Sequence, residues 1–89
     1  MLQRKVTIIN RLGLHARAAA KFVKLANRFS ASVKIEKDSV SIDGKSILGI
    51  LTLAAVQGTE IKLKISGKDE KSAMKALISL IENLFEEEE

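Results

Sequence analysis

The 89-residue chain contains no cysteine, tryptophan or tyrosine, and its only aromatic residues are three phenylalanines. Without cysteine it can form no disulfide bond, thiolate metal site or thiol nucleophile, so a hydrophobic core must hold the fold together. With so few rings, it lacks the aromatic platforms on which RRM-type domains stack RNA bases. These absences remove several classes of binding protein and enzyme from consideration.

Long apolar runs and metal-binding clusters are also missing from the sequence. No apolar run approaches the roughly 18 residues of a membrane-spanning helix, and residues 1–5 lack the apolar segment of a signal peptide. The single histidine is accompanied by no second histidine, cysteine or cluster of carboxylates. We therefore expect a cytoplasmic protein that neither enters a membrane nor binds a metal or cofactor.

The residues that are present suit one small domain over residues 1–89 with one core, since 46% of them are hydrophobic. The net charge of +4 is uneven, because four glutamates at 86–89 form an acidic tail and the rest of the chain is more basic. A basic domain can bind nucleic acid, a membrane surface or an acidic protein. Charge alone does not choose among these partners.

Hydrophobic periodicity predicts seven elements in the order strand, helix, strand, strand, helix, strand, helix. Their expected ranges are 2–9, 16–28, 32–37, 40–42, 47–55, 59–66 and 69–85, with fraying expected after residue 85. The strands alternate between apolar and polar residues, so one face of the sheet should be buried and the other solvated. Ala20 in the first helix and Leu84 in the last are expected on the core-facing sides. The pattern predicts an α+β fold, a two-layer open-faced β-sandwich.

His15 stands between a glycine loop at Gly13 and a helix expected to begin at Ala16. A helix N-terminus presents unpaired backbone N–H groups and favours an anion, here from Ala16 and Arg17. The Arg17 guanidinium adds a fork-shaped donor for oxyanions. A lone histidine is often only structural, but this surrounding favours a nucleophilic nitrogen that accepts a phosphoryl group.

Ser46 follows a Gly44-Lys45 pair and precedes the short apolar helix. The segment is similar to the end of a Walker A loop, but Ser39 occupies the position where that motif needs its first glycine, so we reject an ATP site. The simplest role for Ser46 is to cap the helix. The alternative is a phosphorylation site, since a phosphate at a helix N-terminus changes the charge of a partner surface.

The short helix holds more apolar residues than one buried face can take. Some of Ile47, Leu48 and Leu51 should therefore be exposed, as they are on a protein-docking surface. A basic stripe on the first helix, including Lys21 and Lys24, would extend this surface. Core filling remains the default explanation for each of the apolar residues.

Two segments resemble motifs of the HPr family, the histidine-containing phosphocarriers of the bacterial phosphoenolpyruvate-dependent phosphotransferase system. They are GLHARAA at residues 13–19, similar to the active-site motif, and GKSILG at residues 44–49, similar to the serine-site motif. The resemblance covers essentially the whole chain. It implies a βαββαβα fold with a four-stranded antiparallel sheet in the order 1-4-2-3, covered by three helices.

The resemblance also implies a phosphoryl carrier rather than an enzyme. Enzyme I would phosphorylate His15, and an enzyme IIA component would receive the group. Arg17 would steady the phosphoryl oxygens, and a serine kinase/phosphorylase would act on Ser46 in some members. Neither nucleic acid nor membrane insertion is implied, and we expect a monomer.

The chain departs from many family members at two positions: Ala18 replaces a proline, and Leu12 replaces a small polar residue. Segments 18–21 and 54–59 look similar to the regulatory branch, which includes nitrogen-related phosphocarriers. The branch, the enzyme IIA served and the use of Ser46 are therefore open. Two other hypotheses are a regulatory binding module controlled through Ser46 and, more weakly supported, a nucleic-acid-binding domain.

Overall fold

In the computed structural model, which describes residues 1–86, four strands form one antiparallel sheet in the order β1-β4-β2-β3. The elements are β1 (Leu2–Thr7), α1 (Ala16–Ala26), β2 (Ser32–Lys37), β3 (Val40–Asp43), α2 (Ile47–Thr52), β4 (Glu60–Ser66), α3 (Glu70–Glu82) and the short 3₁₀ turn η1 (Leu84–Glu86). The predicted fold class, element order and strand order are confirmed. Several ends are shorter than expected, most clearly α2, which ends three residues before residue 55.

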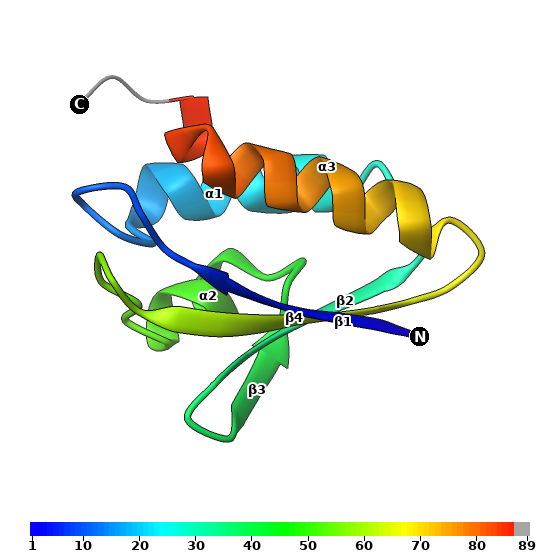
Figure 1. Ribbon diagram of the computed structural model, residues 1–89, viewed down its shortest axis with the longest axis horizontal. Helices are drawn as coiled ribbons and strands as arrows, with labels where there is room; N and C mark the ends of the chain where they lie inside the picture. The colour runs from blue at the N-terminus through cyan, green and yellow to red at the C-terminus, as the bar shows by residue number, and fades with distance from the viewer. Residues whose placement is uncertain (87–89) are drawn as a thin grey trace.

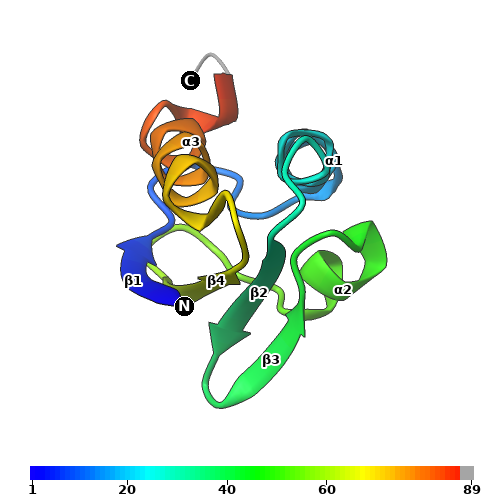
Figure 2. The same cartoon turned by 90° about the vertical axis from the view of Figure 1, so that its right-hand side faces the viewer.

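The helices form a layer over one side of the sheet (Figures 1 and 2). α3 lies above β1 and β4, α1 lies beside α3, and α2 packs against α1 and β3. The loop from β1 to α1 and the loop from α2 to β4 meet at the left end of Figure 1. This end carries the start of α1 and hence His15.

The core follows from the alternation expected in the strands. Ile61, Leu63 and Ile65 of β4 are buried, and Val33 and Ile35 of β2 lie beside them. Helix side chains complete the same cluster, among them Phe22, Leu77 and Ile81. Burying a large apolar side chain stabilises the fold by roughly 1.5–3 kcal/mol, so this cluster replaces the missing disulfides.

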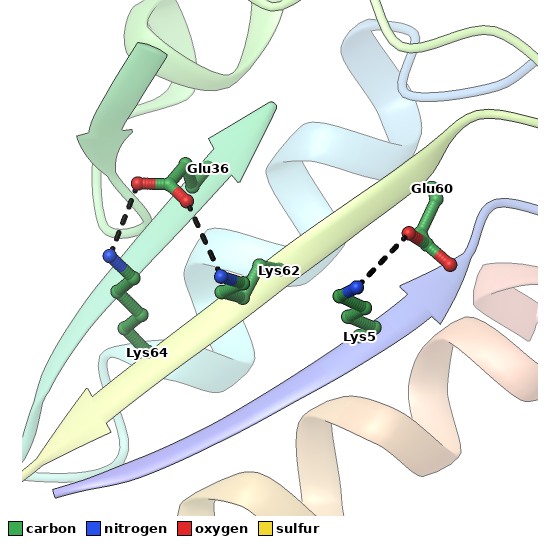
Figure 3. Close-up of polar contacts among 5 residues, drawn as sticks. All are labelled: Lys5, Glu36, Glu60, Lys62 and Lys64. Carbon is green, nitrogen blue, oxygen red and sulfur yellow. Dashed lines mark hydrogen bonds and ion pairs between the residues drawn. The ribbon is translucent and has the colours of Figure 1, made fainter. Parts of the chain in front are cut away.

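The open face of the sheet carries charged side chains at the alternate positions (Figure 3). The Glu36 carboxylate pairs with the Lys64 ammonium at 3.1 Å and with that of Lys62 at 3.8 Å. Lys5 and Glu60 form a looser pair at 4.0 Å. These strands thus have one apolar and one charged face, as predicted.

The expected position of Ala20 is wrong. Ala20 is exposed, and the buried side of α1 consists of Ala18, Ala19, Phe22 and Ala26. Positions three and four apart share a helix face, which puts Ala20 with Arg17 and Lys24 on the exposed side. Alanine is small enough for either environment, so hydrophobicity alone did not place it.

The expected extension of α3 through Leu84 to residue 85 is also wrong, because the helix ends at Glu82. Leu84, Phe85 and Glu86 have φ of 57°, 56° and 62°, which a right-handed helix cannot continue. This turn directs Phe85 into the core, and the Lys21 ammonium donates to its carbonyl oxygen at 2.8 Å. Residues 87–89 of the acidic tail, where fraying was expected, lie outside the described residues.

Within residues 1–86 we find no helix that is both long and apolar enough to span a membrane.

Candidate functional site

His15 occupies the N-cap position of α1, with φ −78° and ψ 177°, and the helix begins at Ala16 as predicted. The first i→i−4 hydrogen bond of the helix runs from the Ala19 N–H to the His15 carbonyl at 2.9 Å. The N–H groups of Ala16, Arg17 and Ala18 therefore point beyond the helix start, where an anion is favoured. His15 is half-buried and stands directly at a helix end of the kind that favours an anion.

The charge around this helix end is positive. The first turn contains no acidic residue, and Arg17 is exposed within it. Residues 1–35 contain no aspartate or glutamate at all, and neither do residues 44–59. The residues next to His15 in sequence therefore offer a phosphoryl group a cation and backbone donors.

The turn before His15 is closed from both ends. The Gly13 N–H donates to the Asn10 carbonyl at 3.1 Å, and the Asn10 side-chain amide donates back to the Gly13 carbonyl at 2.8 Å. Asn10 is completely buried. We did not single out Asn10 from the sequence, although asparagine is favoured at the first position of such a turn.

A second loop, residues 53–59, holds this turn in place. The Leu14 N–H donates to the Ala55 carbonyl at 2.9 Å, and the Gln57 side chain donates to the Ile9 carbonyl at 3.1 Å. Gly13 has φ +67°, and a Cβ there would collide with the Ala55 carbonyl oxygen and lie 2.9 Å from the Val56 Cα. The two loops thus touch through backbone, and only glycine fits at their contact.

Ser46 caps α2, the simpler of its two expected roles. Its side-chain oxygen accepts a hydrogen bond from the Gly49 N–H at 3.0 Å. The neighbouring Lys45 ammonium donates to the Phe29 carbonyl, just past the end of α1, at 2.8 Å. Because α1 and α2 pack together, Ser46 lies on a helix that adjoins the one carrying His15.

The apolar residues of α2 divide between core and solvent. Ile50 is buried and Leu51 is half-buried, whereas the exposed fractions are 41% for Ile47 and 76% for Leu48. The expected surplus of apolar side chains is therefore on the surface. Large exposed apolar residues of this kind are typical of binding surfaces.

The two lysines expected beside this surface differ. Lys24 is exposed, whereas Lys21 is half-buried and its ammonium is bonded to the Phe85 carbonyl. Local sequence could not reveal this contact, because its partners are 64 residues apart. Lys21 thus ties the end of the described chain to α1.

Among residues 1–86, no group of three or more histidine, cysteine, aspartate or glutamate residues could hold a metal ion. What the site offers is one imidazole, a guanidinium and a helix start.

A family model described as "PTS HPr component phosphorylation site" matches residues 2–83. The chain belongs to the HPr family. Its relatives include the phosphocarrier protein HPr of Cupriavidus necator, which is 51% identical over 89 residues and all of both chains. A crystal structure of HPr from Thermoanaerobacter tengcongensis is 46% identical, covers all of both chains and superposes with a TM-score of 0.96.

Members of the HPr family are phosphocarriers of the phosphotransferase system rather than catalysts. The chain is therefore a phosphocarrier protein. Its similarity extends to a crystal structure described as an HPr dimer, also from T. tengcongensis, at 46% identity, a TM-score of 0.79 and coverage of 98% of this chain and 100% of that one.

Proposed function

We propose that His15 carries the phosphoryl group as a phosphohistidine between enzyme I and an enzyme IIA component. One ring nitrogen attacks the phosphorus on enzyme I, a new N–P bond forms, and the bond to the donor breaks. The reverse set of bond changes delivers the group to a histidine of enzyme IIA. The observation that carries this proposal is the N-cap position of His15, with the N–H groups of Ala16 and Arg17 aimed past the helix start.

Arg17 would bind the phosphoryl oxygens, because its guanidinium lies in the same first helical turn and is exposed. Phosphoryl transfer needs mainly positioning and charge stabilisation. A histidine, an arginine and a helix start are therefore sufficient on the carrier side, and the partner supplies the remaining groups.

Partner docking would use Ile47, Leu48 and Leu51, with Lys24 as a cationic neighbour. Exposure supports Leu48 most strongly, at 76%. Lys21 would contribute less than the sequence suggested, since its ammonium is already bonded to the Phe85 carbonyl. We propose a monomer as the working form, to be checked by sedimentation, because one copy contains every residue named.

The direct test is to incubate the protein with enzyme I and radiolabelled phosphoenolpyruvate. The label should appear on the protein, should be lost in acid and should be absent from His15→Ala. Label that persists in His15→Ala, or no label on the wild type, would rule the proposal out. Adding enzyme IIA should then remove the label from the wild-type protein.

A second candidate function is regulation through phosphorylation of Ser46 by a serine kinase/phosphorylase. It is favoured by the position of Ser46 directly before the exposed Ile47 and Leu48. A phosphate would add roughly −1.5 to −2 charge there and would weaken attraction to an acidic partner. Ser46→Asn is the suitable test variant, because asparagine caps helices as well as serine but has no hydroxyl.

If regulation is the main role, Ser46→Asn should abolish it while His15→Ala leaves it intact. If the carrier role is the main one, Ser46→Asn should transfer phosphoryl groups at the wild-type rate.

A further inference from the structure

A groove lies between the edge strand β1 and α3, on the side of the molecule away from α2 (Figure 2, left). Its volume is about 480 Å³, and its apolar floor is formed by Leu2 of β1 with Met74 and Ile78 of α3. Met74 and Ile78 are only 4% and 5% exposed, and Leu2 is half-buried. Because the floor is recessed, the groove suits a narrow chain segment better than a flat membrane surface.

The outer edge of β1 offers backbone hydrogen bonds beside this groove. β1 is an end strand of the sheet, and within residues 1–86 it pairs only with β4. Just past β1, the Ile8 N–H donates to the Thr59 carbonyl at 2.9 Å, and the Ile8 carbonyl accepts from the Gly58 N–H at 2.7 Å. Since the backbone groups of an antiparallel strand alternate between its two edges, those of Gln3 and Lys5 are directed outward. An extended segment can pair with such an edge.

The rim of the groove is cationic. Arg4, Lys71 and Lys75 line it, and Glu82 is the one carboxylate among the described residues that do so. Glu70, at the start of α3, pairs with the N-terminal ammonium at 3.4 Å. Complementary charge selects partners at an interface, so the groove favours a segment that carries acidic side chains.

We propose that this groove binds an extended, acidic and apolar segment of a partner protein as an added strand on β1. The backbone of the segment pairs with the outer edge of β1, its apolar side chains cover Leu2 and Ile78, and its carboxylates meet Arg4, Lys71 and Lys75. The site does not include His15, so this inference goes beyond the proposed function and does not depend on it.

A second copy of this chain is disfavoured as the occupant. Pairing two β1 edges would place Arg4 and Lys5 of one copy beside the same residues of the other. Lysine on an edge strand opposes self-pairing for this reason, and an acidic segment removes the repulsion.

The probes are the fluorescein-labelled peptide EEVIVEE and its charge-reversed counterpart KKVIVKK. Fluorescence anisotropy should give a Kd below about 1 mM for the acidic peptide and at least about tenfold weaker binding for the basic one. In amide NMR spectra, the acidic peptide should shift Gln3, Lys5 and the α3 residues that line the groove. Equal binding of the two peptides, or shifts confined to other elements, would overturn the proposal.

Charge reversal tests the rim. Arg4→Glu and Lys75→Glu should each weaken binding of EEVIVEE at least about fivefold. The matched control Lys34→Glu makes the same change in net charge at an exposed residue of β2 outside the groove, and should stay within about twofold. Equal losses in all three variants would mean that overall charge binds the peptide. Arg4 and Lys75 are on different elements, so misfolding of one variant leaves the other as a test.

Gln3→Pro tests the backbone pairing, because proline removes an outward N–H and is tolerated on edge strands. It should also weaken peptide binding at least about fivefold, and unchanged binding would exclude the added strand. Sedimentation tests the second copy: self-association that Lys75→Glu abolishes, without binding of EEVIVEE, would assign the groove to a dimer and overturn the proposal.

Discussion

The open face of the sheet and the His15 end of the molecule expose opposite kinds of side chain. On the sheet, Lys62 and Lys64 share the Glu36 carboxylate, and Lys5 pairs with Glu60 (Figure 3). At the His15 end, Leu12, Leu48 and Val56 are each exposed by 60% or more. The open face thus carries cations paired with carboxylates, whereas the surface that would meet partners exposes large apolar side chains.

The open face and the His15 end also differ in their polar contacts. The ion pairs of the sheet join exposed or half-buried side chains, which are worth little in water. The contacts beside His15 join buried side-chain or backbone groups, such as the Asn10 amide and the Gly13 carbonyl. Changes at the two regions should therefore differ both in size and in what they affect.

The largest contrast is expected between Arg17→Ala and Lys62→Ala. Both remove an accessible cation, but only Arg17 lies in the helical turn beside His15, the proposed phosphoryl acceptor. We expect phosphoryl transfer through Arg17→Ala to fall about a hundredfold, because one oxyanion donor is lost, and Lys62→Ala to stay within about twofold. Rapid-quench measurement of labelled protein gives both rates. Equal losses in the two variants would mean that overall charge matters rather than the Arg17 position.

A stability contrast is expected between Asn10→Ala and Gln3→Ala. Asn10→Ala leaves the buried Gly13 carbonyl without its side-chain donor, and should lower the free energy of unfolding by about 1–3 kcal/mol. Gln3 is exposed on β1, so its removal should cost less than about 0.5 kcal/mol. Urea denaturation measures both. A neutral Asn10→Ala variant would show that the turn does not depend on this bond.

We expect the free energy of unfolding to depend on pH through Asp69, which stands at the N-cap position of α3 at the far end of the molecule (Figure 1, right). This residue belongs to neither of the two regions compared above. The backbone N–H groups of Ser30 and Ala31 each donate to the Asp69 carboxylate at 2.9 Å. The Ser30 bond above all, and the Ala31 bond with it, hold the pKa of Asp69 below its ordinary value of 3.8. Because the folded-state pKa is lowered, this stabilisation is present above the unfolded-state pKa and is lost as pH falls through the folded-state value.

Urea denaturation of the wild type and Asp69→Asn from neutral pH downward tests this expectation. The wild type should be more stable at neutral pH, and the difference should shrink below pH 3.8 as Asp69 protonates. A difference that stays constant with pH would exclude the carboxylate charge as its cause.

The smallest effect is expected for Glu36→Gln on the open face. The change removes the anion shared by Lys62 and Lys64 but leaves a polar side chain, so stability should fall by less than about 1 kcal/mol and the loss should shrink at high salt. Transfer should be unchanged. A large effect on the transfer rate would show that the open face also takes part in phosphoryl transfer.

The local pattern of apolar and polar residues was sufficient to predict the strands and the starts of α1 and α2. Ile61, Leu63 and Ile65 alternate with lysines, and this period of two predicts one buried face. Glycine before His15 and serine before Ile47 predicted where α1 and α2 begin. The sheet order came only from the family resemblance, because strand pairing depends on contacts distant in sequence.

Two of the misses share one physical cause, which is dependence on tertiary contacts. Phe85 lies beyond the helical periodicity and is buried by a turn of positive φ. Asn10 is polar and in a loop, yet it is buried because the loop folds over its own side chain. Ala20 is the exception, because its spacing from Arg17 and Lys24 already puts it on the exposed side of α1.

Gly13 allows two segments that are distant in sequence to lie against each other. Its missing side chain lets the turn before His15 and the loop after α2 meet through their backbones. Any residue larger than glycine at position 13 would push these two segments apart and move the Ala55 carbonyl to which the Leu14 N–H donates. The absence of one side chain thus lets the loop after α2 lie directly against the turn that leads into His15.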